Sequence, residues 1–338
     1  GWDEYLKDTN IFLILSGSSI GMMEKETLSY KAPLYGRRSG QILLQSLRFN
    51  DFKKFFPAKR FEELLKIHTV TGGIPAYILQ FTQKSSFENA LKENIFNIHS
   101  YLYNEVEFIL KEELREPRTY FSILKAIAFG KRKFGEIVNE TGLQKNIIMK
   151  YLHVLEDLHL IKKDVPVTEE TALKSKKGLY FISEQFFIFW FNYIFPFKSE
   201  LELERYESVF SELNKSFNSL VSLNYEKVSR EIIMDNSPKI FPSPRIGRWW
   251  DNSDEIDTVA LNEKENSILF GEAKWSNKPV GINIFKDLKR KSQKVNWGKE
   301  NRREYYCLFS KSGYTAEMLK LAKEEKVILF HKDRLLCS

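Results

Sequence analysis

The chain has 338 residues, which is more than one hydrophobic core usually organises, so two to four domains are expected. Its 43% hydrophobic and 29% charged residues are typical of a folded protein and exclude the disordered, collagen-like and disulfide-rich classes. Lys and Arg outnumber Asp and Glu by 52 to 45, a net charge of +7, which makes an anionic partner such as nucleic acid plausible without requiring one.

The first predicted element is a strand at residues 10–16. Its apolar run, Asn-Ile-Phe-Leu-Ile-Leu-Ser, ends at Gly17-Ser18-Ser19, a pattern typical of a buried interior strand in a parallel sheet. The phosphate-binding pattern Gly-x-x-x-x-Gly-Lys-Ser/Thr does not occur in the sequence, and neither does an apolar strand that ends in two acidic residues. ATP hydrolysis by these residues alone is therefore not expected.

This strand end and the later segment Pro33-Leu-Tyr-Gly-Arg-Arg-Ser-Gly40 resemble the late part of archaeal and bacterial AAA+ (STAND-like) P-loop ATPases. The resemblance implies that residues 1–48 are the C-terminal remnant of an ATPase core. It also implies that Ser18 faces the γ-phosphate and that Arg37 supplies a cation near the nucleotide. ATP is then a cofactor only where a phosphate-loop half lies upstream or on another chain.

Residues 49–117 are predicted to form an all-helical region. Large apolar side chains recur there at three- and four-residue spacing, at Phe52, Phe55, Phe56, Phe61, Leu64 and Leu65. The segment Thr71–Tyr77 predicts the end of one helix and the start of another, and it resembles the lid of the same ATPases. We expect the aromatic stripes to form core rather than a ligand site.

Residues 118–197 resemble a winged helix followed by an aromatic linker. The predicted elements are three helices and two strands, at 119–129, 134–141, 144–159, 161–165 and 178–182, with Gly142 in the turn of a helix-turn-helix and a basic wing between the strands. The outward residues Lys145, Asn146 and Lys150 are predicted to contact DNA. The alternative is a winged helix that serves only for packing or for docking a partner.

Residues 255–275 predict a β-hairpin that concentrates charge. Apolar and polar side chains alternate on both sides of a turn at 262–266. Because side chains alternate along a strand, Glu272 and Lys274 share one face, and antiparallel pairing can place Asp257 beside them. Asp257 and Glu272 supply the oxygen ligands that Mg²⁺ or Mn²⁺ prefers, while Lys274 can orient or deprotonate a water or steady phosphate charge.

An Asp on the first strand followed by Glu-x-Lys on the second resembles the PD-(D/E)XK restriction-endonuclease-like superfamily. The resemblance implies a domain of that kind at residues 198–338 and a metal-dependent nuclease as its ancestry. Members of the superfamily take a further catalytic acid from a preceding helix, and Glu226 matches that position. The same resemblance implies that a helix and two further strands follow the hairpin, and the sequence predicts strands at 305–310 and 327–330.

A basic helix is predicted directly after the hairpin, at residues 284–293. Lys286, Lys289 and Arg290 give it a face of the sort that contacts phosphates. Gln293 lies where some members of the superfamily place a glutamine of the site. The segment Arg245-Ile-Gly-Arg-Trp-Trp250, just before the hairpin, resembles the uncharacterised C-terminal domain (DUF234-like) that follows archaeal P-loop ATPases of this kind.

Together these patterns predict a multi-domain α/β plus α protein: a remnant of a P-loop ATPase core, a helical lid, a winged helix-turn-helix and a restriction-endonuclease-like α/β domain. We expect a DNA-associated protein that hydrolyses phosphodiesters with Mg²⁺ or Mn²⁺. Two alternatives stay open, a non-catalytic module that binds nucleic acid or protein and the C-terminal part of an ATPase whose nucleotide site lies upstream.

DNA is the expected partner, and a homo-oligomer or a partner protein also remains open. No apolar run reaches the roughly 20 residues of a membrane helix, so no membrane partner is expected. The two cysteines, Cys307 and Cys337, are too few for a disulfide framework and fit a reducing cytoplasm.

Overall fold

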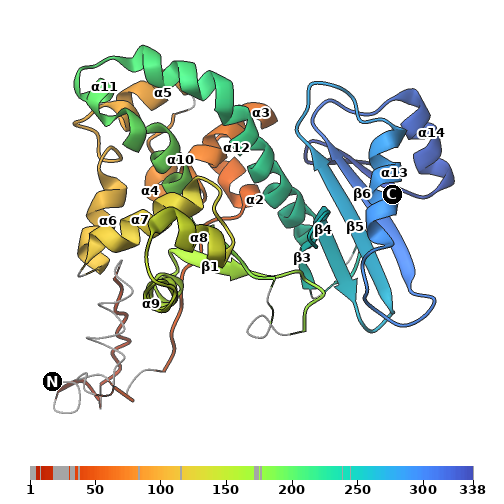
Figure 1. The fold of residues 1–338 in the computed structure, drawn as a ribbon, viewed down its shortest axis with the longest axis horizontal. Coiled ribbons are helices and arrows are strands. Elements are labelled where there is room, and N and C mark those ends of the chain that lie inside the picture. The colour runs from red at the N-terminus through yellow and green to blue at the C-terminus, as the bar shows by residue number, and fades with distance from the viewer. Residues whose placement is uncertain are drawn as a thin grey trace.

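The fold is known from a computed structural model of the chain. It describes residues 5–7, 9–17, 30, 35–36, 39–82, 84–114, 116–170, 175, 177–237, 239–243 and 245–337. Ser18 and Arg37, the predicted nucleotide-sensing residues, lie outside the described residues, as do Lys174 and Lys176 of the predicted basic wing. Figure 1 shows a helical part and a sheet covered by helices, with one long helix running between them.

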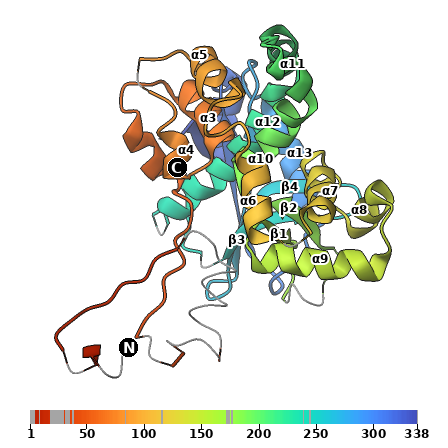
Figure 2. The same ribbon diagram turned by 90° about the vertical axis from the view of Figure 1, so that its left-hand side faces the viewer.

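The prediction of a buried strand at residues 10–16 is wrong. Residues 11–17 belong to no strand and are exposed, Phe12 by 81% and Ile14 by 75%. Figure 2 shows the red N-terminal ribbon running away from the body of the molecule. A buried strand needs neighbouring strands that accept and donate its backbone hydrogen bonds, and none of the described segments pairs with this one.

The first part of the body consists of short helices, as the apolar spacing predicts. They are α2 (Phe49–Phe52), a 3₁₀ turn (Lys53–Phe55), α3 (Phe61–Thr71), α4 (Pro75–Ile78), α5 (Phe87–Leu91), a π-helical turn (Lys92–Phe96) and α6 (Glu105–Glu113). The predicted break between Thr71 and Tyr77 is confirmed. Gly72 ends α3 with a φ of 59°, a conformation that favours glycine, and Pro75 begins α4.

The helices and strands predicted for the winged helix are all present. They are α7 (Pro117–Ala128), α8 (Phe134–Thr141), α9 (Lys145–Asp157), β1 (Ile161–Asp164) and β2 (Leu179–Ile182). Gly142 is left-handed, with a φ of 66°, and turns the chain from α8 into α9. β1 and β2 pair antiparallel, from Ile161 opposite Ile182 to Asp164 opposite Leu179.

The aromatic linker forms the centre of the molecule rather than a surface connection. It contains α10 (Gln185–Tyr193) and a 3₁₀ turn (Phe195–Phe197). The short α11 (Lys198–Glu202) and the 30-residue α12 (Tyr206–Asp235) follow it. Trp190 is fully buried, and its indole N–H donates to the carbonyl oxygen of Tyr103 over 2.8 Å. This hydrogen bond therefore connects α10 with the loop before α6.

The C-terminal part is a six-stranded mixed sheet in the order β3-β4-β5-β6-β7-β8. Its elements are β3 (Arg245–Trp250), β4 (Glu255–Asn262), β5 (Ser267–Lys274), α13 (Ile282–Ser292), β6 (Arg303–Ser310), α14 (Ala316–Glu324), β7 (Ile328–His331) and β8 (Arg334–Cys337). β5, β6 and β7 run parallel, and the other neighbours are antiparallel. The predicted hairpin, the basic helix after it and the two later strands are confirmed, whereas β3 and β8 were not predicted.

One hydrophobic core joins the helices, the winged helix and one face of the sheet. Its members range from Phe49 in α2 to Phe330 in β7. α12 contacts α3 and α10 as well as β4 and β5, so it connects the helical part with the sheet. The other face of the sheet forms a second core with α13 and α14, which includes Phe285 and Met318. The domain bounds at residues 48, 117 and 197 stay predictions, but the parts from Phe49 onward share packing.

His68 is a titratable group buried in this core, so its protonation links the stability of the core to pH. Its ring lies edge-on to Phe49 and Phe52, and Asn224 of α12 donates to its Nδ1 over 3.0 Å. Burial, and then the charge of Lys227, lowers the pKa of His68 to about 3. The folded state therefore keeps His68 neutral, while the unfolded chain binds a proton below its ordinary pKa of about 6.5.

We expect the free energy of unfolding to fall as the pH drops below about 6.5, with His68 contributing about 2 kcal/mol of the loss between about pH 7.5 and pH 5. His68→Leu should remove that share of the pH dependence, whatever its effect at pH 7.5. Urea unfolding at the two pH values measures it. The exposed His99→Asn is the control, and an unchanged pH dependence in His68→Leu would contradict the assignment.

Candidate active site

The candidate site lies where strands β4 and β5 part. Their paired residues run from Asn262 opposite Ser267 to Thr258 opposite Gly271, and Asp257 and Glu272 are the next residues on the two strands. The pairing of β3 with β4 also shifts at this level, between Gly247 and Trp249. A bulge re-aims the side chains next to it, and this one lies beside the part of β4 that carries Asp257.

Three carboxylates meet at this place. Oxygens of Glu226 from α12 and of Glu255 and Asp257 from β4 all lie within 4.8 Å of one another. The backbone N–H of Ala273 donates to Asp257 over 2.9 Å, and Asp257 is 5% exposed. Burial, and then the charges of Glu226 and Glu272, raise the pKa of Asp257 well above its usual value. Clustered carboxylates of this kind are what a bound cation would stabilise.

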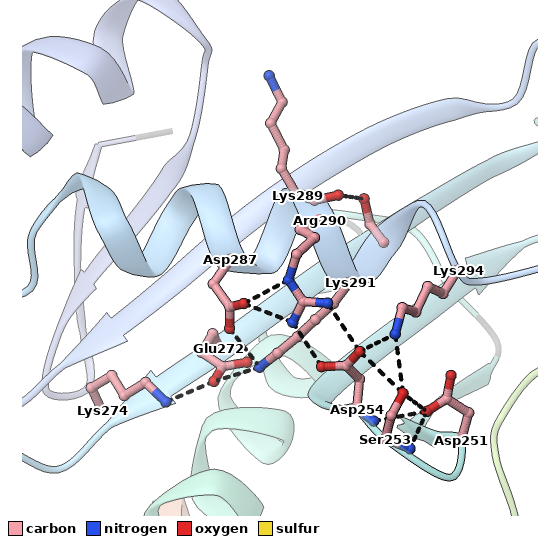
Figure 3. Close-up of polar contacts among 11 residues, drawn as sticks. Asp251, Ser253, Asp254, Glu272, Lys274, Asp287, Lys289, Arg290, Lys291 and Lys294 are labelled. Carbon is pink, nitrogen blue, oxygen red and sulfur yellow. Dashed lines mark hydrogen bonds and ion pairs between the residues drawn. The ribbon is translucent and has the colours of Figure 1, made fainter.

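Glu272 and Lys274 lie side by side, as the alternation along β5 predicts. The Lys274 ammonium donates to Glu272 Oε1 over 2.7 Å, and Lys291 of α13 lies 3.6 Å from the same oxygen (Figure 3). The second oxygen of Glu272 is buried and has no hydrogen-bond partner among the described residues. Partial burial acts to lower the pKa of Lys274, but the contact with Glu272 raises it overall, so its ammonium form is favoured.

The carboxylate group differs in one member from the predicted metal ligands. Asp257 belongs to it as predicted, but Glu272 is held by two lysines, and Glu255 stands in the group instead. Glu255 is two residues before Asp257 on one strand, so the alternation that placed Glu272 beside Lys274 would also have found it. The donors are all hard oxygens, and they fit Mg²⁺ or Mn²⁺ in chemical type.

The basic face of α13 is largely neutralised by neighbouring acids (Figure 3). Arg290 forms two hydrogen bonds to Asp254, over 3.0 and 2.7 Å, and also contacts Asp287. Lys294 contacts Asp254 as well, and the Lys289 ammonium lies 2.7 Å from Glu325. These contacts reduce the charge that the sequence suggested for phosphate binding. The other two predicted residues of this helix, Lys286 and Gln293, are exposed.

The predicted DNA-contacting residues of the winged helix lie on one exposed surface. Lys145 and Asn146 begin α9, and Lys150 follows on the same helix. The opposite face of α9 contributes Ile148, Leu152 and Leu155 to the core. This surface belongs to a different part of the winged helix from the hairpin that contacts the C-terminal sheet.

Comparisons with known proteins agree with the resemblance seen in the segment before the hairpin. The DUF234 family, described as archaeal and bacterial proteins of unknown function, matches residues 190–294. An uncharacterised protein of Methanocaldococcus jannaschii is 39% identical over 316 residues, which cover 91% of this chain and 70% of that protein. The chain belongs to the DUF234 family.

The DUF234 match includes most elements of the candidate site. Residues 190–294 contain the whole of α12 and the strands β3, β4 and β5, and therefore all four carboxylates and Lys274. No solved structure matches this DUF234 protein. Among its described helices, none combines the length and the apolar character that crossing a bilayer requires.

Proposed function

We propose that this DUF234 protein hydrolyses phosphodiester bonds of nucleic acid with Mg²⁺ or Mn²⁺, at the site formed by Glu226, Glu255, Asp257, Glu272 and Lys274. The observation that carries the proposal is the convergence of carboxylates from α12 and β4, next to the paired Glu272 and Lys274 of β5. The element order supports it, since the helix α12 precedes the hairpin and α13 follows, as the PD-(D/E)XK resemblance implies.

The residues divide into two roles. Glu226, Glu255 and Asp257 would hold the cation, which when bound polarises a phosphoryl oxygen and lowers the pKa of a coordinated water. Lys274 remains protonated beside Glu272, so it is suited to hold the attacking water and to stabilise the negative charge that develops on the phosphate. Glu272 fixes the position of that ammonium group.

Lys274→Met tests the proposal, because it keeps the length of the side chain and removes its charge. We expect metal-dependent cleavage to fall by about 10²-fold or more, which is typical of the loss of one group that stabilises charge in a transition state. The assay offers single-stranded, duplex and branched DNA with Mg²⁺ or Mn²⁺. Lys278→Met, at an exposed position after β5, is the matched control. Equal cleavage by the two variants would contradict the role of Lys274.

A non-catalytic module that binds nucleic acid is the second candidate. The observation in its favour is that Asp257 and Glu272 are 5% and 6% exposed, so a substrate would have to displace protein groups to reach them. On this reading the exposed α9 surface binds DNA, and the carboxylates mark only ancestry. DNA binding that is indifferent to metal and to Glu272→Gln, without cleavage of any substrate, would favour it.

A further inference from the structure

Strand β3, the Arg-Ile-Gly-Arg-Trp-Trp segment, is where the winged helix contacts the C-terminal sheet. The backbone N–H of Val167 donates to the carbonyl oxygen of Arg248 over 2.8 Å, and the Trp250 indole donates to the carbonyl oxygen of Lys177 over 3.1 Å. Gly247 faces Val167 so closely that a Cβ would lie 3.0 Å from it. Val167 and Lys177, two described residues of the connection between β1 and β2, therefore lie against the edge of the sheet, next to the candidate site.

Arg248 carries a buried donor that the protein does not satisfy. The residue is 7% exposed, and its Nη2 donates to Glu255 over 3.0 Å. Its Nε is buried and has no hydrogen-bond partner among the described residues. A buried N–H without an acceptor costs free energy, and more so on a charged group, so this nitrogen points to an acceptor that comes with a ligand.

The winged helix places further cations around this guanidinium. Arg132 and Arg248 both contact the ring of Phe181, at 4.6 and 5.4 Å from its centroid. Lys162 of β1 is exposed and lies within electrostatic range of Arg230 and Arg248. Burial and the charge of Arg248 lower the pKa of Arg132 and of Arg230. Positively charged side chains from the winged helix, from α12 and from β3 thus lie close together. They repel one another.

Acidic groups face the same cluster and set the balance of charge. Glu226 and Glu255 lie near Arg132, and Asp164 lies near Lys162 and Arg230. Glu226 and Glu255 are also members of the carboxylate group. A cation bound by those carboxylates would leave the arginines and lysine with less compensating charge, and a phosphate would then supply it.

We infer that Arg132, Lys162 and Arg248 bind a backbone phosphate of a nucleic-acid strand whose neighbouring phosphodiester lies at the carboxylates. The choice of nucleic acid as the ligand rests on the proposed function. The inference adds the path that the nucleic-acid strand takes over the protein. The winged helix then binds the nucleic-acid strand through the side that carries β1 and Phe181, and not through the exposed surface of α9. Arg132 and Arg248 offer planar guanidinium groups, which suit phosphate oxygens.

Binding without metal tests the inference independently of cleavage. The measurement is the fluorescence anisotropy of a labelled DNA strand, and of its duplex, titrated with the full chain in EDTA over a range of salt. Lys162→Gln lies on an exposed position, so the fold should tolerate it. We expect about 5- to 10-fold weaker binding and a salt slope smaller by about 0.7 to 0.9, the value of one lost phosphate contact. Arg132→Gln should behave alike.

Lys163→Gln is the matched control, because Lys163 is the next residue of β1 and its side chain lies over Gly178 on the other face of the hairpin. It should bind as the wild type does. Wild-type affinity and salt slope in both Lys162→Gln and Arg132→Gln would overturn the inference. So would a loss of binding confined to Lys145→Gln and Lys150→Gln in α9.

The two proposals fail in distinguishable ways. A wild type that cuts no substrate, while Lys162→Gln and Arg132→Gln still weaken binding, would remove the nuclease and support the phosphate site. A wild type that cuts DNA, while both variants bind and cut normally, would keep the nuclease and overturn the phosphate site.

Discussion

Asp257→Asn should abolish metal-dependent cleavage, with a loss of about 10³-fold or more, and should also abolish stabilisation by the metal. The change keeps the shape of the side chain and an oxygen that can accept from the Ala273 N–H, so the hairpin should stay folded. It removes one of the three carboxyl groups whose oxygens lie within 4.8 Å of one another and which a bound cation would hold in their charged form. Since a hard cation binds through charged oxygens, its affinity should drop with that charge.

The effect on stability gives a readout that needs no catalysis. A metal that binds only the folded state stabilises it, by about 2.7 kcal/mol at a concentration of 100 times the dissociation constant. Thermal unfolding with and without Mg²⁺ or Mn²⁺ should therefore show a rise in Tm for the wild type and none for Asp257→Asn. Glu324→Gln, at an exposed position of α14, should keep the rise. An equal rise in Asp257→Asn would remove Asp257 from the metal site.

In the absence of metal the same variant should be at least as stable as the wild type. Asp257 is buried among acids, and the charges of Glu226 and Glu272 act against its ionised form. A neutral amide avoids that repulsion. Higher stability without metal together with lost activity would mark a position that is tuned for function rather than for folding.

The local part of this site could be predicted from the sequence. Alternation along β4 and β5 placed Glu272 beside Lys274 and brought Asp257 to the same level, because a two-residue period and an antiparallel register leave little freedom. Glu226 required more than periodicity. A helical pattern alone does not say which turn of a 30-residue helix lies against the end of a strand, and its choice came from the resemblance.

Contacts between distant segments could not be predicted in this way. The basic face of α13 looked free for phosphates, but Asp254, which lies 36 residues before Arg290, binds that arginine. The prediction of a strand at residues 10–16 was wrong because a buried strand needs a neighbouring strand. None of the described residues pairs with this segment. The orphaned Nε of Arg248 likewise depends on the winged helix and the sheet together. Charge and apolarity in a sequence show what a segment can pair with, and the fold decides whether it does.

Trp190→Ala should cost about 5 kcal/mol of unfolding free energy, and one cooperative transition should carry the whole loss. The indole is fully buried, packs on Phe121 and Phe195, and donates to the Tyr103 carbonyl, so truncation leaves a cavity and an unsatisfied acceptor.

Because the core around Trp190 continues from α2 to β7, the helical part, the winged helix and the sheet should unfold together. Urea unfolding followed by fluorescence and by circular dichroism tests both claims. Phe108→Ala, on an exposed aromatic of α6, should cost less than about 0.5 kcal/mol. Two separate transitions in the wild type, with only the first moved by Trp190→Ala, would show that the sheet folds on its own and that the shared core does not couple them.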